Sequence, residues 1–83
     1  MLSSRRVQAV CTEVANVLRL EREKQELSMS VVAERAGISQ QMVSYVERGM
    51  RIPTLETLVR MCAALEVELA DVIKRGEKAA AKA

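Results

Sequence analysis

Apolar residues recur at the spacing of an α-helix along most of the chain, and short polar stretches interrupt the pattern. The first segment of this kind starts at Ser3 or Ser4 and runs to about Gln25. Its apolar positions share one broad face, and they are Val7, Val10, Cys11, Val14, Val17 and Leu18. This pattern predicts a long first helix, whose apolar start needs cover from the end of the chain or from a second subunit.

Two short helices joined by a tight turn are predicted between residues 28 and 49. Ser28 and Ser39 are suited to cap them, because a serine hydroxyl can accept from the free N–H groups of a first helical turn. Gly37 stands where the first of these helices has to end in a left-handed residue, which glycine adopts without a Cβ clash. The second helix turns Val43 and Val46 inward and presents Gln40, Gln41, Ser44 and Tyr45 on its other side. This outline is that of a helix-turn-helix.

The chain after residue 50 predicts two more helices. Pro53 disfavours helical structure just before it, and Thr54 is suited to cap the helix that follows. We expect the inner face of this helix to hold Leu55, Leu58, Met61, Cys62 and Leu65, while Leu69, Val72 and Ile73 mark a fifth helix that ends at Gly76. The chain then divides into one domain, residues 1–76 with the motif at 28–49, and a flexible basic tail of alanine and lysine, residues 77–83.

The helix-turn-helix segment and its flanks resemble a known family. The run VVAERAGISQQMVSYVERG, followed by PTLETLVRMCAALEV, is similar to the lambda-repressor/Cro family of transcriptional regulators, and the similarity extends from about Val14 to Ile73. The resemblance implies an all-α, five-helix lambda-repressor-like DNA-binding domain, here with an extended first helix. The family usually has glycine where this chain has Glu26 and Glu66. Either these two residues are left-handed, at a cost of about 1 kcal/mol or more, or the preceding helices end differently.

The outward side of the second motif helix carries the candidate base contacts. An α-helix fits the major groove of DNA, and the residues at its start meet the base edges first. Gln40 and Gln41 hold these positions, and their amides offer the donor and the acceptor that match adenine N6 and N7. The resemblance implies contacts with bases or the nearby backbone for Gln40, Gln41, Ser44 and Tyr45. The alternative is that all four are ordinary solvated polar residues.

Residues on both sides of the recognition helix are candidates for contacts with DNA phosphates. The start of the first motif helix presents free N–H groups near Met29 and Ser30, which form an anion site. Arg48 and Arg51 follow the recognition helix, and Thr54 begins the next one. The alternative for the two arginines is that they only keep the loop soluble.

Arg22 and Glu47 match a charged pair that the family buries between the first helix and the end of the recognition helix. Such a pair would have a structural role, because it would hold the recognition helix at a fixed angle to the rest of the domain. The alternative is two separate surface charges, which contribute almost nothing to stability.

Composition narrows the possible functions. The 83 residues include no Phe or Trp, so the core must be aliphatic, and the formal net charge of +2 gives only weak support for nucleic-acid binding. The two cysteines, Cys11 and Cys62, could form a disulfide, a redox pair or two small buried hydrophobes, and in a chain inside the cell we expect the last of these. With no histidine and only two cysteines, we expect no zinc site. No apolar run reaches the ~18 residues that span a membrane, and no signal peptide is evident, so we expect a cytoplasmic protein.

The function that these features favour is sequence-specific binding of double-stranded DNA by a transcriptional regulator, with no cofactor and no catalysis. The resemblance implies a homodimer on a pseudo-palindromic operator, joined through the fifth helix, the start of the first helix, or both. The alternative is a protein-interaction module, antitoxin-like or a scaffold, that uses the same fold. Exposed apolar side chains such as Leu20, Val31 and Met42 would favour that alternative.

Overall fold

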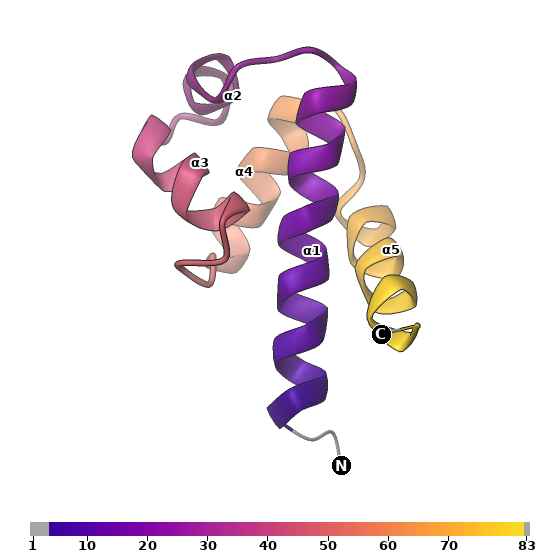
Figure 1. The fold of residues 1–83 in the computed structure, drawn as a ribbon. Coiled ribbons are helices and arrows are strands. Elements are labelled where there is room, and N and C mark those ends of the chain that lie inside the picture. The colour runs from indigo at the N-terminus through magenta and orange to yellow at the C-terminus, as the bar shows by residue number, and fades with distance from the viewer. Residues whose placement is uncertain (1–3, 83) are drawn as a thin grey trace.

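The computed structural model describes residues 4–82, and the residues it describes form helices and turns with no strand (Figure 1). The five helices are α1 (Ser4–Lys24), α2 (Met29–Ala36), α3 (Gln40–Glu47), α4 (Leu55–Leu65) and α5 (Leu69–Ala81). The prediction of an all-α, five-helix domain with a long first helix is therefore confirmed. No helix in this described part of the chain has the length and apolar character needed to cross a membrane.

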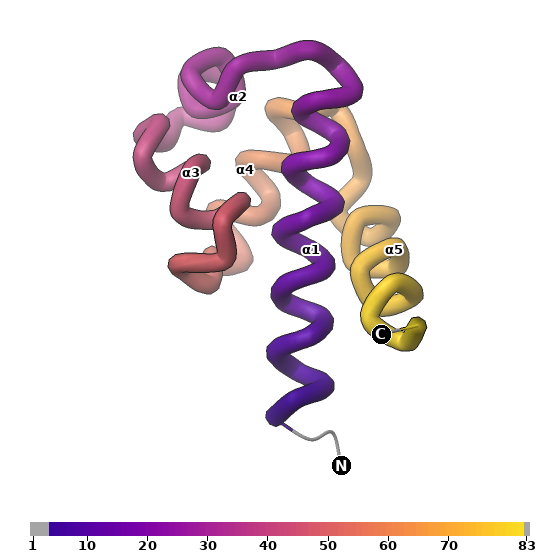
Figure 2. The backbone as a smooth tube through the Cα atoms, viewed as in Figure 1, coloured from indigo at the N-terminus to yellow at the C-terminus, as the bar shows by residue number. Residues whose placement is uncertain are grey.

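The long helix α1 organises the other four. In Figure 1, α2, α3 and α4 gather around its C-terminal half, while α5 packs along its opposite side. The tube in Figure 2 shows the first turns of α1 projecting beyond this group. The molecule is consequently elongated, with extents of 37 × 20 × 18 Å.

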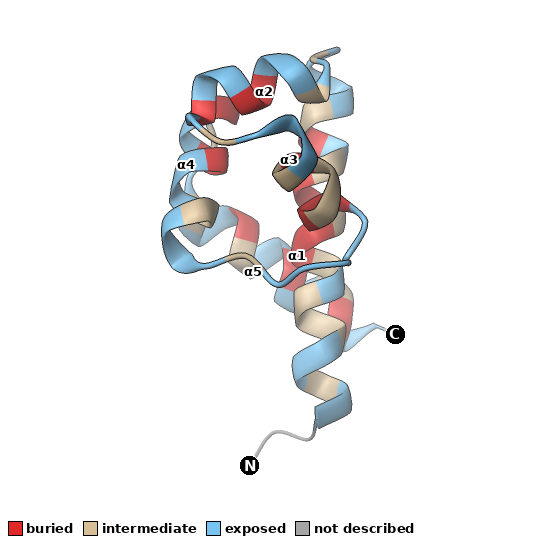
Figure 3. Ribbon diagram, turned by 90° about the vertical axis from the view of Figure 1, so that its left-hand side faces the viewer, coloured by how far each residue is buried: buried red, intermediate tan, exposed pale blue. Residues whose placement is uncertain are grey.

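The core is aliphatic, as the composition requires, and all five helices contribute to it. Its largest fully buried side chains are Leu18, Val32, Val43, Val46, Met61, Leu65 and Val72. Full burial of such a side chain contributes about 1.5–3 kcal/mol each. Figure 3 shows the buried positions on the sides of the helices that face one another. The prediction that Leu55 faces this core is wrong, because Leu55 is the first residue of α4 and is 68% exposed.

Two glutamates take the left-handed conformation that glycine adopts most easily. Glu26 has φ 57° and Glu66 has φ 56°. Each of them follows the end of a helix, and the next residue donates its N–H to a carbonyl of the last helical turn. Leu27 donates to Arg22 at 3.1 Å, and Val67 donates to Cys62 at 3.0 Å. Of the two alternatives left open by the sequence, the structure therefore has the left-handed glutamates. These hydrogen bonds offset the strain of about 1–2 kcal/mol at each position.

Gly76 is a packing glycine inside α5, and the prediction that it ends the helix is wrong. A Cβ at this position would lie 2.6 Å from Cγ2 of Val14 and 3.2 Å from its Cα. The missing side chain lets α5 approach the backbone of α1, so the helix continues past it to Ala81 and buries Ala80. The division into a domain of residues 1–76 and a flexible tail of residues 77–83 stays a prediction.

A salt bridge that the sequence did not predict fastens α5 to α1. Arg75 Nη1 donates to Glu21 Oε1 at 2.6 Å, and Glu21 is 7% exposed. The hydrogen bond from Arg75, opposed by burial, holds the pKa of Glu21 below its usual value. The carboxylate therefore stays charged on an otherwise apolar helix face, and it fixes α5 beside α1.

Candidate nucleic-acid interface

The turn between α2 and α3 is built as the sequence predicted. Ser28 Oγ accepts from the N–H of Val31 at 3.1 Å at the start of α2, and Ser39 Oγ accepts from the N–H of Met42 at 3.0 Å at the start of α3. Gly37 ends α2 with φ 71° and ψ 33°. These local hydrogen bonds fix both the end of one helix and the start of the next, and so they set the angle between them.

One side of α3 is buried and the other is open. Val43 and Val46 are 0% and 1% exposed, and they attach α3 to the core. Gln40 and Gln41 are exposed, whereas Ser44 and Tyr45 are half-buried. The four predicted base-contacting side chains are thus brought together on the outer side of one short helix.

Three of these four side chains already have partners within the protein. Gln41 Nε2 donates to Tyr45 Oη at 2.7 Å, and the Arg51 guanidinium carbon lies 5.7 Å from the centre of the Tyr45 ring. Arg48 Nη1 donates to Ser44 Oγ at 3.4 Å. Within residues 4–82, the exposed amide of Gln40 has no such partner. The outer side of α3 is therefore a connected polar surface with one unengaged amide at its start.

Arg22 and Glu47 form a bidentate salt bridge between α1 and the end of α3. Arg22 Nε and Nη2 donate to the two carboxylate oxygens at 2.7 and 3.0 Å, and Nη1 donates to the carbonyl of Leu27 at 2.8 Å. Their side chains are only 13% and 1% exposed. The hydrogen bonds to Glu47 raise the pKa of Arg22 above its already high value. Two independent surface charges would not be buried in this way, so the pair holds α3 against α1.

Arginines also bind the last carbonyls of α2 and α4, and no sequence pattern predicted these contacts. Arg60 Nη1 on α4 donates to the carbonyl of Ala36 at 3.2 Å, and Arg35 Nη1 on α2 donates to that of Ala64 at 3.5 Å. Basic residues commonly satisfy the last carbonyls of a helix. Here each arginine donates to a carbonyl of the other helix. These two hydrogen bonds therefore depend on the packing of α2 against α4, which the sequence alone does not show.

The predicted phosphate contacts lie at both ends of the motif. Ser30, Arg48, Arg51 and Thr54 are exposed, and Thr54 Oγ1 also accepts from the N–H of Thr57 at 3.1 Å as the cap of α4. Met29 is half-buried and its side chain packs against the core, so only its backbone N–H can meet an anion. Of these positions, Arg48 and Arg51 contact Ser44 and Tyr45 on the outer side of α3.

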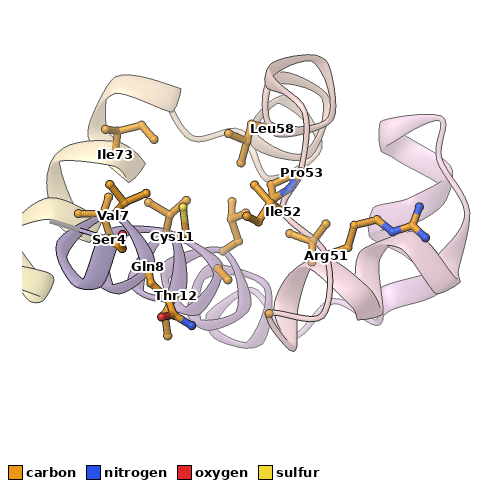
Figure 4. Close-up of a pocket in the computed structure, with 16 residues that line it drawn as sticks. Ser4, Val7, Gln8, Cys11, Thr12, Arg51, Ile52, Pro53, Leu58 and Ile73 are labelled. Atoms are coloured by element: carbon orange, nitrogen blue, oxygen red, sulfur yellow. The ribbon is translucent and has the colours of Figure 1, made fainter. Parts of the chain in front are cut away.

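An apolar groove opens between α1, α4, α5 and the loop before α4, and no sequence pattern predicted it (Figure 4). Its volume is about 620 Å³. Leu58 and Ile73 face Val7 and Cys11 across it, and Ile52 lies at one end. Val7 is 50% exposed and Ile52 is 75% exposed. The apolar start of α1 therefore remains partly uncovered within the described chain.

The two cysteines are both free thiols, and they differ in environment. Cys62 is 2% exposed in the core, and burial raises the pKa of its thiol. Cys11 is half-buried and lines the groove, so the expectation of burial is met fully by Cys62 alone. Among residues 4–82, no three His, Cys, Asp or Glu side chains are grouped so that they could hold a metal ion.

Comparison with known sequences identifies the class to which this fold and exposed helix belong. A family model described as helix-turn-helix matches residues 18–72. The uncharacterized HTH-type transcriptional regulator y4dJ of Sinorhizobium fredii is 42% identical over 59 residues, which are 71% of this chain and 75% of that protein. The similarly described Rv0474 of Mycobacterium tuberculosis is 42% identical over 50 residues, which are 60% of this chain and 36% of that longer relative.

Solved structures share the arrangement of helices. The clp gene regulator ClgR of Corynebacterium glutamicum has a TM-score of 0.78 at 26% identity, over 84% of this chain and 91% of that chain. The restriction-modification controller protein C.AhdI of Aeromonas hydrophila has a TM-score of 0.71 at 27% identity, over 75% of this chain and 94% of that chain. The chain belongs to the lambda-repressor/Cro-type helix-turn-helix family.

Proposed function

We propose that this protein is a transcriptional regulator that binds specific double-stranded DNA sequences, with α3 and the residue after it, positions 40–48, in the major groove. The observation that supports this most strongly is that α3 is fixed to the core on one side and exposed on the other. Its inner side is anchored by Val43 and Val46, its end is held by the Arg22–Glu47 pair, and its outer side is polar and open. A helix presented in this way can enter the groove without rearrangement of the core.

The proposed contacts divide into two kinds. Base edges are met by Gln40 and Gln41 at the start of α3, followed by Ser44 and Tyr45. Phosphates are met by the backbone at Met29 and Ser30, by Arg48 and Arg51, and by Thr54. Phosphate contacts hold the protein in register, while base contacts select the sequence. The protein acts by binding alone, with no cofactor or catalytic step, and it works in the cytoplasm, where a regulator of this kind meets DNA.

The salt dependence of binding tests this function against its rival, a protein-interaction module of the antitoxin or scaffold type. Leu20 and Val31 are 45% and 37% exposed, as that rival requires, although Met42 is half-buried against the core and does not support it. A dimer that makes about six to ten phosphate contacts should lose roughly 10³–10⁵ in affinity for a labelled duplex between about 50 and 200 mM salt. Weak binding that does not change with salt would favour the rival.

The proposed assembly is a homodimer on a pseudo-palindromic operator, with half-sites about 34–36 Å apart. The surface proposed for the interface is the apolar groove, because it combines the start of α1 with α5 and leaves Val7 and Ile52 exposed at its edges. A second copy, related by a two-fold axis, would cover the same apolar residues on both subunits.

Val7→Glu should weaken self-association by about 100-fold or more, because a two-fold interface contains residue 7 of both subunits and would therefore bury two unpaired carboxylates. Sedimentation equilibrium measures the effect. The matched control is Leu20→Glu on the same helix, since Leu20 is 45% exposed, against 50% for Val7, and lies outside the groove. Equal effects of the two substitutions, or no self-association of the unmodified protein, would rule out this interface.

A further inference from the structure

Three side chains, two on α3 and one in the loop that follows it, contact one another in series. Gln41 and Tyr45 are one turn apart on α3, and the amide donates to the phenol oxygen at 2.7 Å. Arg51, from the loop that follows, places its guanidinium carbon 5.7 Å from the centre of the Tyr45 ring. Arg51 also contributes to the lining of the apolar groove, and Figure 4 shows its guanidinium group extending away from that groove.

This arrangement restricts the rotation of the Gln41 side-chain amide, which is normally free in an exposed glutamine. The two ends of an amide are chemically opposite, and its rotation exchanges a donor for an acceptor at the position facing DNA. The hydrogen bond to Tyr45 directs Nε2 of Gln41 toward the phenol, and it leaves Oε1 and the second N–H available. That pair is the acceptor and donor that adenine requires in the major groove.

Tyr45 is itself held from a second direction. A guanidinium over an aromatic ring is attracted by the ring's π-electrons, and the ring of Tyr45 is already half-buried. The attraction involves the charge of Arg51 and leaves its N–H groups free to meet a phosphate. Arg51 therefore helps to fix the position of the Tyr45 ring, and the Tyr45 hydroxyl in turn fixes the orientation of the Gln41 amide.

We propose that Tyr45 is a positioning residue for base recognition, which sets the sequence preference by holding the Gln41 amide in the orientation that pairs with adenine, with Arg51 as its brace. This inference rests on the proposed function. It refines the base contact proposed above for Tyr45: the Tyr45 hydroxyl contributes to base recognition through Gln41, to which it is hydrogen-bonded.

A double-mutant cycle with Tyr45→Phe and Gln41→Ala tests this role. The probes are a duplex selected from a random pool by the unmodified protein and a scrambled duplex of the same length. Tyr45→Phe keeps the ring and removes only the hydroxyl, so the ratio of the two affinities should fall about three- to tenfold, as expected for one lost hydrogen bond. In the Gln41→Ala background, the same change should have no effect on the ratio.

Ser44→Ala is the matched control, since it removes another hydroxyl from the same helix that is bonded to Arg48 and not to Gln41. Its effect should add to that of Gln41→Ala. If Tyr45→Phe is also additive with Gln41→Ala, the phenol acts independently and the positioning role is wrong, although the protein still recognises DNA. If the unmodified protein selects no duplex from the pool, the proposed function fails instead, and the positioning role fails with it.

Discussion

Replacing Arg22 by methionine is expected to lower the free energy of unfolding by about 3–5 kcal/mol. The Glu47 side chain is 1% exposed, and Arg22 supplies two of its hydrogen bonds. Methionine fills similar space and removes the charge, so it leaves a buried carboxylate without compensation. Urea unfolding of the purified variant measures the loss, which is a large part of the stability of about 5–15 kcal/mol that is usual for a domain.

Two further variants show whether burial is the cause. Arg19→Met removes the pair with Glu23 on the same helix, whose side chains are 40% and 49% exposed, and should change stability by less than about 1 kcal/mol. Combining Arg22→Met with Glu47→Leu should recover most of the loss, because an apolar pair needs no charge compensation. If Arg22→Met had no larger effect than Arg19→Met, the pair would not hold α3 in place.

The parts of the fold that depend only on residues close together in the sequence were predictable from it. The caps at Ser28, Ser39 and Thr54 each accept from an N–H three residues later, and Gly37 is left-handed. Their geometry needs no partner beyond the same turn, so residue type and spacing are sufficient.

Contacts between distant elements required more than periodicity. Arg22 and Glu47 are 25 residues apart, and only the resemblance to a family suggested that they meet. Arg75 and Glu21 form a comparable pair across 54 residues, and no signal identified it. A charged residue on a helix can face solvent or form an ion pair with another helix. Which of the two occurs depends on the distance between the helices, which the sequence does not give.

Gly76 is a position where a local sequence rule gave the wrong prediction, because a distant residue determines its role. Glycine near the end of an apolar pattern usually ends a helix, and that general tendency gave the wrong result. Its actual role depends on Val14, which lies 62 positions earlier and would collide with a Cβ. The apolar groove was also unpredictable, because it is the space left after α1, α4 and α5 have packed.

Gln40→Ala and Gln41→Ala should each weaken binding to the preferred duplex by about 1–3 kcal/mol, and should have little effect on random DNA. Both amides are exposed at the start of α3, and each can supply a donor and an acceptor to one base pair. Titration of the same labelled duplexes with each variant gives both affinities. Equal losses on preferred and random DNA would mean that these residues contact the backbone and do not select bases.

Selection of binding sites from a random duplex pool, run in parallel with the unmodified protein and the Gln40→Ala/Gln41→Ala variant, tests most directly whether α3 reads DNA sequence. We expect the unmodified protein to enrich a short motif in two inverted copies, with centres about 34–36 Å apart. The variant should lose the preference at the positions that face the start of α3 while it still binds DNA. A pool that stays random with the unmodified protein, or the same motif enriched equally by both proteins, would contradict recognition by these two glutamines.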